Sequence, residues 1–302
     1  MSTYRLDKIF DPRSIALIGA SPREGALGHT VLRNLREAGF SRPILLVNPK
    51  HRDIDGEPCV ARIEDLAPVP DLIVVVTPAA TVPRIVASAG RRGVAGAVIV
   101  TAGLGHGAGS LAEAARIEAR KHGLRLVGPN CLGVMAPPAK LNASFAARNA
   151  TPGDLALISQ SGAVEAGLLE WAARRRVGFS GLVSLGDMVD VDFGDCLDYF
   201  AADRGTRAIL LYIEAIADAR KFMSAARAAA RTKPVVVIKS GRHAQGARAA
   251  ATHTGALAGS DAVYEAAFRR AGLLRVFDLD ELFAAAETLG RQKPFPGSVS
   301  PS

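Results

Sequence analysis

Residues 14–39, with the sequence SIALIGASPREGALGHTVLRNLREAG, decide the fold of the first half of the chain. A short β-branched apolar run ends at Gly19, a glycine-containing turn extends to Gly28, and a helical pattern follows. A buried strand followed by such a turn and a helix start lets backbone N–H groups and the helix dipole approach a pyrophosphate closely. This stretch therefore predicts a parallel α/β sheet with a phosphate-binding turn after its first strand.

Similar apolar runs recur along the chain between Ala-rich amphipathic stretches, which is typical of parallel strands covered by crossover helices on both faces. We expect strands in the first half at residues 14–19, 43–48, 72–77, 96–101 and 124–128, and in the second half at residues 155–159, 181–186, 208–213 and 235–239. The chain should therefore contain two open, doubly wound α/β sheets that bind ligands at the carboxyl ends of their strands.

The domain boundary is expected near residue 139. Residues 133–153 are rich in Pro, Ala and Asn without a clear period, so they are predicted to separate the two sets of strands. We place the first domain at residues 1–138, the second at 139–290, and a Pro-, Gly- and Ser-rich linker or tail at 291–302. A chain of 302 residues that is 49% hydrophobic is long enough for two cores.

Composition narrows the class of protein. No apolar run reaches membrane-spanning length and the first residues lack the layout of a signal peptide, so we expect a cytoplasmic protein that does not contact the membrane. Cys59, Cys131 and Cys196 lie far apart, so we expect reduced thiols with no metal site. The net charge of +8 is spread along the chain and aromatics are only 5%, which favours a ligand with several phosphates over nucleic acid.

The turn departs from the dinucleotide fingerprint. Ser21 replaces the second glycine, and the second strand ends in Asn48, Pro49 and Lys50. An NAD site requires a carboxylate there for the ribose hydroxyls, whereas a lysine suits a phosphate on the ribose. The sequence therefore favours coenzyme A, whose ribose carries a phosphate, and an NAD-dependent oxidoreductase is the last of the alternatives.

The other strand ends of the first half are small or polar, as a groove for an extended ligand requires. They are Thr77-Pro78, Thr101-Ala102-Gly103 and Gly128-Pro129-Asn130. Each alone is equally well an ordinary βα turn. Their occurrence on successive strands favours the groove.

A second candidate anion site lies in the second half. Residues 159–163, SQSGA, follow an expected strand and open a helix, although a plain helix cap by Ser161 is the simpler alternative.

Residues 240–260 contain His253 and almost no large apolar side chain, which is uncommon unless the segment is functional or mobile. Glu214, at the end of a buried strand, could hold one imidazole nitrogen and leave the other as a nucleophile toward phosphorus. A solvated histidine and a capping or salt-bridged glutamate are the alternatives.

The chain resembles the CoA-binding and first ligase domains of the NDP-forming acyl-CoA synthetases, a family that includes the succinyl-CoA synthetase alpha subunit. The matches run over nearly the whole chain, through IALIGAS, VNPK, VVVTPA, VTAGLG, GPNCLGV, LISQSGA, LLYIEAI and the stretch from KSGRHAQGARAAATHTGALAGS to LLRV. Within the family, the chain resembles in sequence most the fused bacterial members, which may also append an ATP-grasp and an acetyltransferase domain. The resemblance implies a Rossmann-type CoA-binding domain followed by a flavodoxin-like ligase domain.

The resemblance also implies roles for individual residues. His253 corresponds to the loop histidine that carries the phosphoryl group, Glu214 to the carboxylate that orients it, and Ser161, Gly162 and Ala163 to the helix start that holds the phosphate. The CoA groove is assigned to Gly19, Ala20, Ser21, Gly28, Asn48, Pro49, Lys50, Thr77, Pro78, Thr101, Ala102, Gly103 and Asn130.

The implied reaction converts acyl-CoA, phosphate and a nucleoside diphosphate reversibly into the acid, CoA and the triphosphate. Nothing in the sequence resembles an ATP-grasp, so we expect the Mg-nucleotide to bind to a partner chain or further domain, and the chain alone to show little turnover. The expected partners are CoA, a small carboxylic acid, the ATP-grasp part, an optional acetyltransferase domain and further subunits of an oligomer. A CoA- or acyl-CoA-sensing module of an acetyltransferase is the alternative function, although His253 favours the enzyme. The acid and the choice of ADP or GDP stay open.

Overall fold

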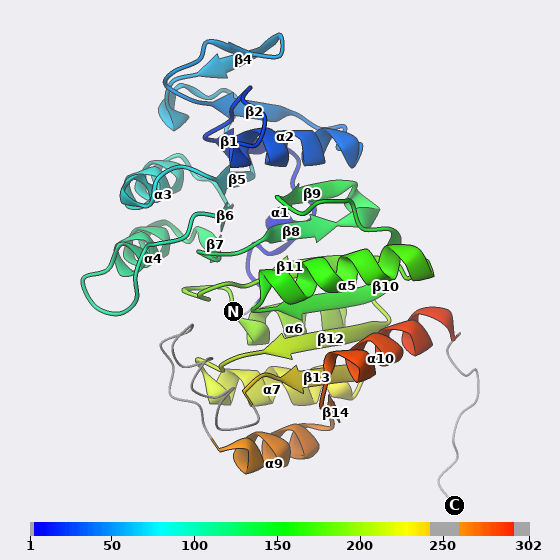
Figure 1. Ribbon diagram of the computed structural model, residues 1–302. Coiled ribbons are helices and arrows are strands. Elements are labelled where there is room, and N and C mark those ends of the chain that lie inside the picture. Colours follow the sequence, from blue (N-terminus) through cyan, green and yellow to red (C-terminus); the bar gives the residue numbers. More distant parts are fainter. Residues whose placement is uncertain (1–2, 242–259, 293–302) are drawn as a thin grey trace, which may run out of the picture.

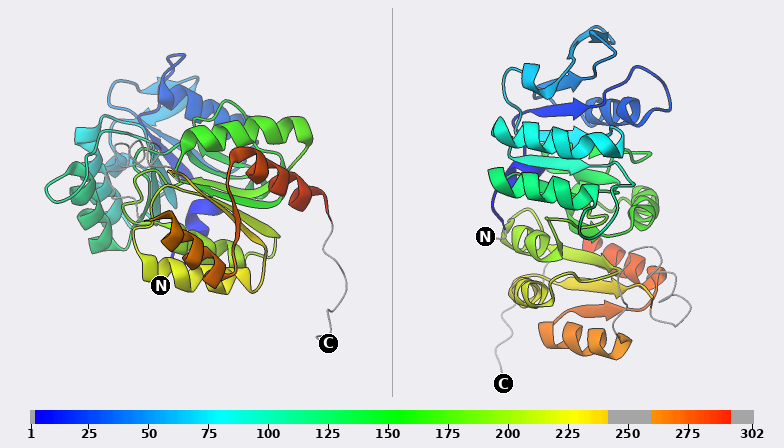
Figure 2. Two further views of the ribbon diagram at one scale, coloured as in Figure 1. Left: turned by 60° about the horizontal axis from the view of Figure 1, so that its bottom comes forward. Right: turned by 90° about the vertical axis from the view of Figure 1, so that its left-hand side faces the viewer.

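The computed structural model describes residues 3–241 and 260–292. This part of the chain forms two seven-stranded sheets, each flanked by helices (Figure 1). The N-terminal domain, coloured blue to cyan, is followed along the long axis of the molecule by the second domain, coloured green to red (Figure 2). None of the helices in these ranges is long and apolar enough to cross a membrane.

The first sheet has the strand order β3-β4-β2-β1-β5-β6-β7. Its strands are β1 (Ile15–Ile18), β2 (Ile44–Val47), β3 (Asp53–Ile54), β4 (Glu57–Val60), β5 (Leu72–Val75), β6 (Gly96–Ile99) and β7 (Arg125–Val127). Apart from the short antiparallel β3, neighbouring strands are parallel. The six parallel strands follow the Rossmann order, with the switch point between β1 and β5, where such sheets bind ligands.

Different helices cover the two faces of this sheet. Two of them, α3 (Val82–Arg91) and α4 (Leu111–His122), pack on one face, where η1 (Ile63–Asp65) and η2 (Ala79–Thr81) lie nearby. The other face carries α1 (Asp7–Phe10) and α2 (Leu27–Glu37). The face that carries α1 and α2 also packs against the second domain.

The second sheet has the order β14-β13-β12-β10-β11-β8-β9. Its strands are β8 (Gly133–Ala136), β9 (Leu141–Ser144), β10 (Pro152–Ser159), β11 (Phe179–Ser184), β12 (Ala208–Ile213), β13 (Val235–Lys239) and β14 (Leu274–Val276). The strands from β10 to β14 are parallel and have the flavodoxin order 2-1-3-4-5, with the switch point between β10 and β12. The expected fold class, a Rossmann-type domain followed by a flavodoxin-like one, is therefore confirmed.

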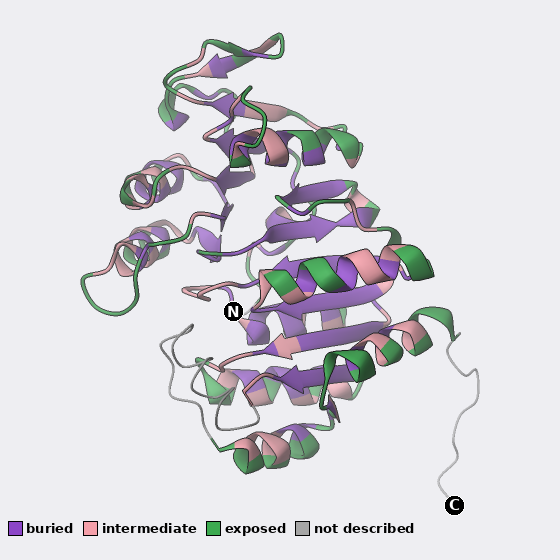
Figure 3. Cartoon of the chain, viewed as in Figure 1, coloured by how far each residue is buried: buried purple, intermediate pink, exposed green. Residues whose placement is uncertain are grey.

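Helices cover both faces of the second sheet as well. One face carries α5 (Gly162–Arg175) and α10 (Leu279–Arg291), and the other carries α6 (Phe193–Ala202) and α7 (Ala219–Ala230), with α9 (Asp261–Ala271) beside α7 (Figure 1). The strands are buried nearly throughout, whereas the outer faces of the helices are exposed (Figure 3). Apolar runs without alternation are the sequence pattern expected for strands covered in this way.

The interpretation of residues 133–153 as an irregular spacer is wrong. Strands β8 and β9 form an antiparallel hairpin around η3 (Pro137–Ala139), and β8 pairs with β11 of the second sheet. All residues of β8 and β9 are buried, and each strand is only four residues long, so the sequence carries a weak signal for them. The second sheet therefore begins at Gly133, before the boundary that we expected near residue 139.

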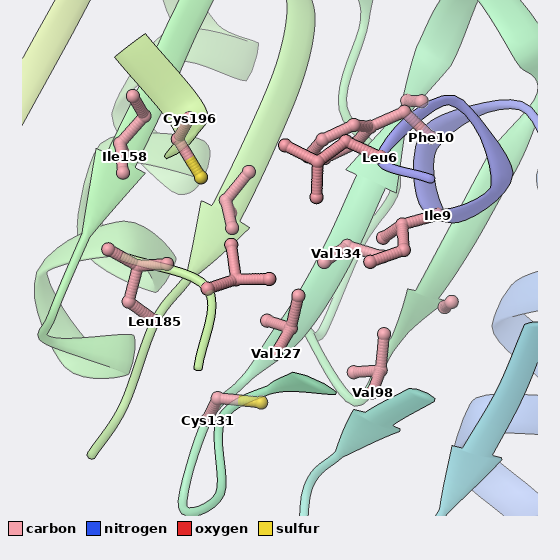
Figure 4. Packing of buried hydrophobic residues seen from close by; sticks show 14 of the residues in the cluster. Leu6, Ile9, Phe10, Val98, Val127, Cys131, Val134, Ile158, Leu185 and Cys196 are labelled. Carbon is pink, nitrogen blue, oxygen red and sulfur yellow. The ribbon is translucent and has the colours of Figure 1, made fainter. Parts of the chain in front are cut away.

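One apolar core continues across both domains. Leu6, Ile9 and Phe10, at and beside α1, lie against Val134 of β8 (Figure 4). The Phe10 ring also lies 5.2 Å from the Phe200 ring of α6, measured between centroids. The domains are thus packed as one body, and separating them would expose this surface to water.

A buried ion network also joins the domains. The Arg125 guanidinium of β7 contacts Asp190 at 2.9 Å and Asp195 at 3.0 Å. Lys221 of α7 contacts Asp195 at 2.7 Å and Asp192 at 2.9 Å. Because Asp195 is 1% exposed, burial raises the pKa of its carboxyl group, and the two cations offset that burial.

A buried asparagine of α2 holds the hairpin of the second domain. The Asn34 side-chain amide donates hydrogen bonds to the Ser144 carbonyl at 2.9 Å and to the Ala146 carbonyl at 2.8 Å. We predict that Asn34→Ala lowers the free energy of unfolding by about 1–3 kcal/mol, because two buried carbonyls lose their donor. Urea denaturation measures the difference. The control Glu37→Ala alters an exposed residue of the same helix, and an equal loss in both variants would contradict the prediction.

Helix α5 has four buried residues, and the first of them is a glutamate. They are Glu165, Leu168, Leu169 and Ala172. Glu165 is fully buried, and neither carboxyl oxygen has a hydrogen-bond partner among the described residues. Burial raises the pKa of Glu165 well above its ordinary value, since the charged form is desolvated. Burial therefore favours the neutral, protonated form of this carboxyl group.

This raised pKa makes stability depend on pH in a defined direction. The folded state binds the Glu165 proton more tightly than the unfolded state does. The resulting contribution to the free energy of unfolding is therefore complete below the ordinary carboxyl pKa of about 4.3, and it decreases as the pH rises above that value. We predict that Glu165→Gln is more stable than the wild type at about pH 8 and that this difference shrinks toward about pH 5. Urea denaturation at both pH values tests it, with the half-exposed Glu170→Gln of the same helix as control. A pH-independent difference would contradict the prediction.

Candidate functional site

A cavity of about 680 Å³ lies at the switch point of the first sheet, where β1, β2 and β5 end. We call it the first-domain cavity. Six of the residues predicted from the sequence line it: Gly19, Asn48, Pro49, Lys50, Thr77 and Pro78. Three strand ends that are far apart in the sequence therefore form one binding surface, as the groove interpretation requires.

The charges around the first-domain cavity suit an anionic ligand. Lys50, Arg62 and Arg84 line it together with one acid, Glu64. The Glu64 carboxylate accepts a hydrogen bond from the Ser88 hydroxyl at 2.5 Å, which lowers the pKa of Glu64. Sequence reasoning missed Arg62 and Arg84, since neither belongs to a recognisable motif. Arg84 could have been found only by its place in the first turn of α3, beside a strand end.

The turn after β1 is built for close approach of the backbone. A Cβ atom on Gly28 would lie 2.0 Å from the Gly19 carbonyl oxygen, so only glycine lets α2 start against the turn. Gly19 itself has φ +99°, in the region that side chains disfavour. The Asn48 side chain donates to the Ala20 carbonyl at 2.7 Å, and the Ser21 hydroxyl accepts from the Arg23 N–H. Ala20, Ser21 and Gly28 thus shape the turn without lining the cavity.

A second cavity, of about 670 Å³, lies between the domains, where β6, β10, β11 and β12 end. We call it the interdomain cavity. It brings together the remaining predicted residues that line a cavity: Ala102, Asn130, Ser161, Gly162, Ala163 and Glu214. Ser161 and Glu214 face it from the two sides of the β10/β12 switch point.

The start of α5 is fixed by a small set of polar contacts. The Ser161 hydroxyl accepts from the Val164 N–H at 3.3 Å, as an N-cap does, and the Ser159 hydroxyl accepts from the Ser161 N–H at 3.0 Å. The Gln160 side-chain oxygen accepts from the N–H groups of Glu214, at 2.6 Å, and Ala215, at 2.8 Å. Gln160 therefore ties the helix start to the end of β12. Its place inside the SQSGA stretch was the signal that sequence reasoning did not use.

The interdomain cavity contains few charges. His106, Asp187 and Glu214 line it, and no lysine or arginine of the described ranges does so. The Asn130 amide donates to the Asp187 carboxylate at 3.2 Å. Among the described residues, the first N–H groups of α5 and its helix dipole would face an anion bound here. Burial raises the pKa of the Cys131 thiol in the same wall, so this thiol stays protonated.

The other predicted residues have different places. The Thr101 hydroxyl donates to the Thr77 carbonyl at 2.8 Å and so joins two strand ends, whereas Gly103 follows in the turn with φ +81°. Neither lines a cavity. His253 lies outside the described residues. Within residues 3–241 and 260–292, no cluster of His, Cys, Asp and Glu side chains could hold a metal ion.

Comparisons with known proteins agree with this architecture. The family model of the CoA binding domain matches residues 13–137, and that of the succinyl-CoA ligase like flavodoxin domain matches residues 152–289. The alpha subunit of acetate–CoA ligase [ADP-forming] I of Pyrococcus furiosus is 42% identical over 291 residues, which are 94% of this chain and 63% of that subunit. Acetate–CoA ligase [ADP-forming] I of Archaeoglobus fulgidus is 44% identical over 92% of this chain and 41% of its own length.

A solved structure is similar over nearly the whole chain. It is the dinucleotide-forming acetyl-coenzyme A synthetase 1 of Ca. Korarchaeum cryptofilum in complex with phosphate and ADP, with a TM-score of 0.92 and 35% identity. The match covers 98% of this chain and 64% of that one, so the chain spans less than two thirds of these relatives. Both domain models and these relatives agree, so the chain combines a CoA binding domain with a succinyl-CoA ligase like flavodoxin domain and is similar over nearly its whole length to parts of ADP-forming acetate–CoA ligases.

Proposed function

We propose that the chain is the CoA-binding, phosphohistidine-carrying part of an NDP-forming acyl-CoA synthetase. The observation that carries the proposal is that the predicted residues gather at the switch points of two sheets, in one basic cavity and in one cavity at a helix start. The named relatives are ligases, which favours the enzyme over a sensing module.

The N-terminal domain, which carries the first sheet, would bind CoA. Lys50, Arg62 and Arg84 supply positive charge for its phosphates in the first-domain cavity. The glycine turn between Gly19 and Gly28 lets the backbone approach the pyrophosphate. The thiol end would extend along Ala102 and Asn130 in the interdomain cavity, and Thr101 and Gly103 would shape the strand end beside them.

The second domain, which carries the second sheet, would form and transfer the phosphoryl group. Phosphate attacks the thioester carbonyl, CoA leaves as the thiolate, and the acyl phosphate then gives its phosphoryl group to an imidazole nitrogen of His253 as the carboxylate leaves. Ser161, Gly162 and Ala163 would hold the phosphate at the α5 start, and Glu214 would orient the imidazole.

The nucleotide site would come from elsewhere. We propose that an ATP-grasp part, in another chain or another domain, binds the Mg-nucleotide and completes an oligomeric, cytoplasmic enzyme. The carboxylic acid would be a small one. The proposal does not depend on an acetyltransferase domain.

Calorimetric titration with CoA, dephospho-CoA and NAD tests the first-domain cavity. We expect CoA to bind more tightly than dephospho-CoA and Lys50→Ala to weaken CoA about tenfold with little effect on dephospho-CoA, since a charge-assisted contact to the ribose phosphate is lost. The control is Arg52→Ala, an exposed basic residue two positions away that does not line the cavity. Binding of NAD without binding of CoA would overturn the proposal.

Labelling with inorganic phosphate tests the phosphoryl carrier without a nucleotide partner. The chain is mixed with acetyl-CoA and radioactive phosphate, and acid-labile label on the protein is measured. We expect His253→Ala to abolish labelling and Glu214→Gln to slow it, with CoA affinity unchanged. His243→Ala, in the same stretch of sequence, is the control. Full labelling of His253→Ala would show that another residue carries the phosphoryl group.

A further inference from the structure

His106 is a histidine in the wall of the interdomain cavity. It lies between the end of β6 and the start of α4, on the same segment as Ala102, which also lines the cavity. Within the part of the chain that the structure describes, its imidazole forms no hydrogen bond and no ion pair. An exposed imidazole without such a partner in a cavity wall is placed to contact a ligand.

The segment around His106 is fixed on both sides. Leu104 is buried in a core cluster of the first domain, and its carbonyl accepts a hydrogen bond from the backbone of α4 at 3.2 Å. The Gly107 carbonyl accepts a hydrogen bond from the Ser110 hydroxyl at 2.7 Å. Gly105 has φ +74° and Gly107 has φ +77°, in the left-handed region that favours glycine. The backbone therefore turns at both neighbours of His106 and holds its side chain at the cavity.

The two domains contribute different walls to the interdomain cavity. The second domain contributes residues 161–163 at the start of α5, where the phosphate would bind. The first domain contributes Ala102, His106 and Asn130, where the thiol end of CoA would lie. In the proposed reaction the phosphate therefore approaches the thioester from the α5 side, and the sulfur departs on the side of the first domain. A proton donor for the sulfur has to come from the wall that carries His106.

Among the described residues of that wall, Cys131 is the other titratable group. Burial raises the pKa of its thiol, and the sulfur donates a hydrogen bond to the Ile99 carbonyl at 3.3 Å, so its proton is held. The carboxyl groups of Asp187 and Glu214 line the cavity from the second domain. Imidazole, by contrast, gains and loses its proton between about pH 5 and 8, as a catalyst of proton transfer must do near neutral pH.

We propose that His106 is the general acid–base for the CoA sulfur. This inference rests on the proposed function and adds a catalytic residue to it. As the phosphate oxygen bonds to the acyl carbon and the C–S bond breaks, the imidazolium gives its proton to the departing sulfur. The imidazole regains a proton from water, to which it is exposed, and the acyl phosphate releases its own proton to water. In the reverse direction the neutral imidazole removes the thiol proton while the sulfur attacks the acyl phosphate and phosphate leaves.

Release of the CoA thiol in the presence of arsenate tests this step without a nucleotide partner. Arsenate attacks acetyl-CoA as phosphate does, and the acyl arsenate hydrolyses, so free thiol accumulates and is measured with a thiol reagent. We expect His106→Ala and His106→Gln each to lower the rate of release about 100-fold, because proton transfer to the sulfur is lost. Calorimetry should show an affinity for CoA within about twofold of the wild type, since the ring is not needed for binding.

The matched control is Ala108→Gln. It changes an exposed residue of the same segment that lines neither cavity, and it should keep the wild-type rate. His253→Ala should also keep the rate of thiol release, because the phosphohistidine would form only after the sulfur has left.

Chemical rescue and pH dependence distinguish proton transfer from a structural role. Added imidazole should restore part of the activity of His106→Ala, since the free base can enter the space of the missing ring. The ratio of the wild-type rate to the His106→Gln rate should fall as the pH rises from about 5 to 8, because the imidazolium is the donor. Taking this ratio removes the ionisation of arsenate, which both proteins experience equally.

The outcomes separate this inference from the proposed function. An unchanged rate in both His106 variants overturns the role, and so does a loss that imidazole does not restore and that leaves the ratio independent of pH. A loss in His253→Ala as large as that in His106→Ala would assign the proton to another group, which also overturns it. If the wild-type chain binds CoA but releases no thiol, the proposed function is refuted and this inference falls with it.

Discussion

The contact of α2 with the β8–β9 hairpin determines where everything else in the molecule lies. Asn34 holds the hairpin by two hydrogen bonds, and the apolar core around Leu6, Ile9 and Phe10 fills the space beside it. Arg125 adds a buried ion network at the same seam. Because the domains are fixed in this way, the strand ends of β6, on one side, and of β10 and β12, on the other, meet in one cavity.

The two cavities differ in the way they could hold negative charge. The first-domain cavity uses the side chains of Lys50, Arg62 and Arg84, which attract phosphates at long range. The interdomain cavity uses backbone N–H groups and the dipole of α5, which act only at short range and only on a group that fits. The first arrangement suits a ligand that must be captured and kept, and the second suits a small phosphate that must enter, react and leave.

The sequence predicted the strands that are apolar and β-branched, since parallel strands covered on both faces leave that pattern. It also predicted the glycine turn and the Asn48-Pro49-Lys50 strand end, because each is local in the chain. It failed for β8 and β9, which are only four residues long each and lie in a stretch rich in Pro, Ala and Asn. It could not find His106, whose place in the interdomain cavity depends on how the two domains pack, or Glu165, which occupies a core position of an ordinary helical pattern.

The side chain of Gln160 has a consequence for how the interdomain cavity responds to a ligand. Its oxygen accepts hydrogen bonds from the N–H groups of Glu214 and Ala215, and the backbone N–H of Gln160 donates to the Tyr212 carbonyl. Gln160 therefore extends the pairing of β10 with β12 beyond the last strand residue. The turn that begins α5 and the backbone of Glu214 are thus held by one side chain. A ligand at the helix start and the Glu214 carboxylate would therefore be positioned by the same support.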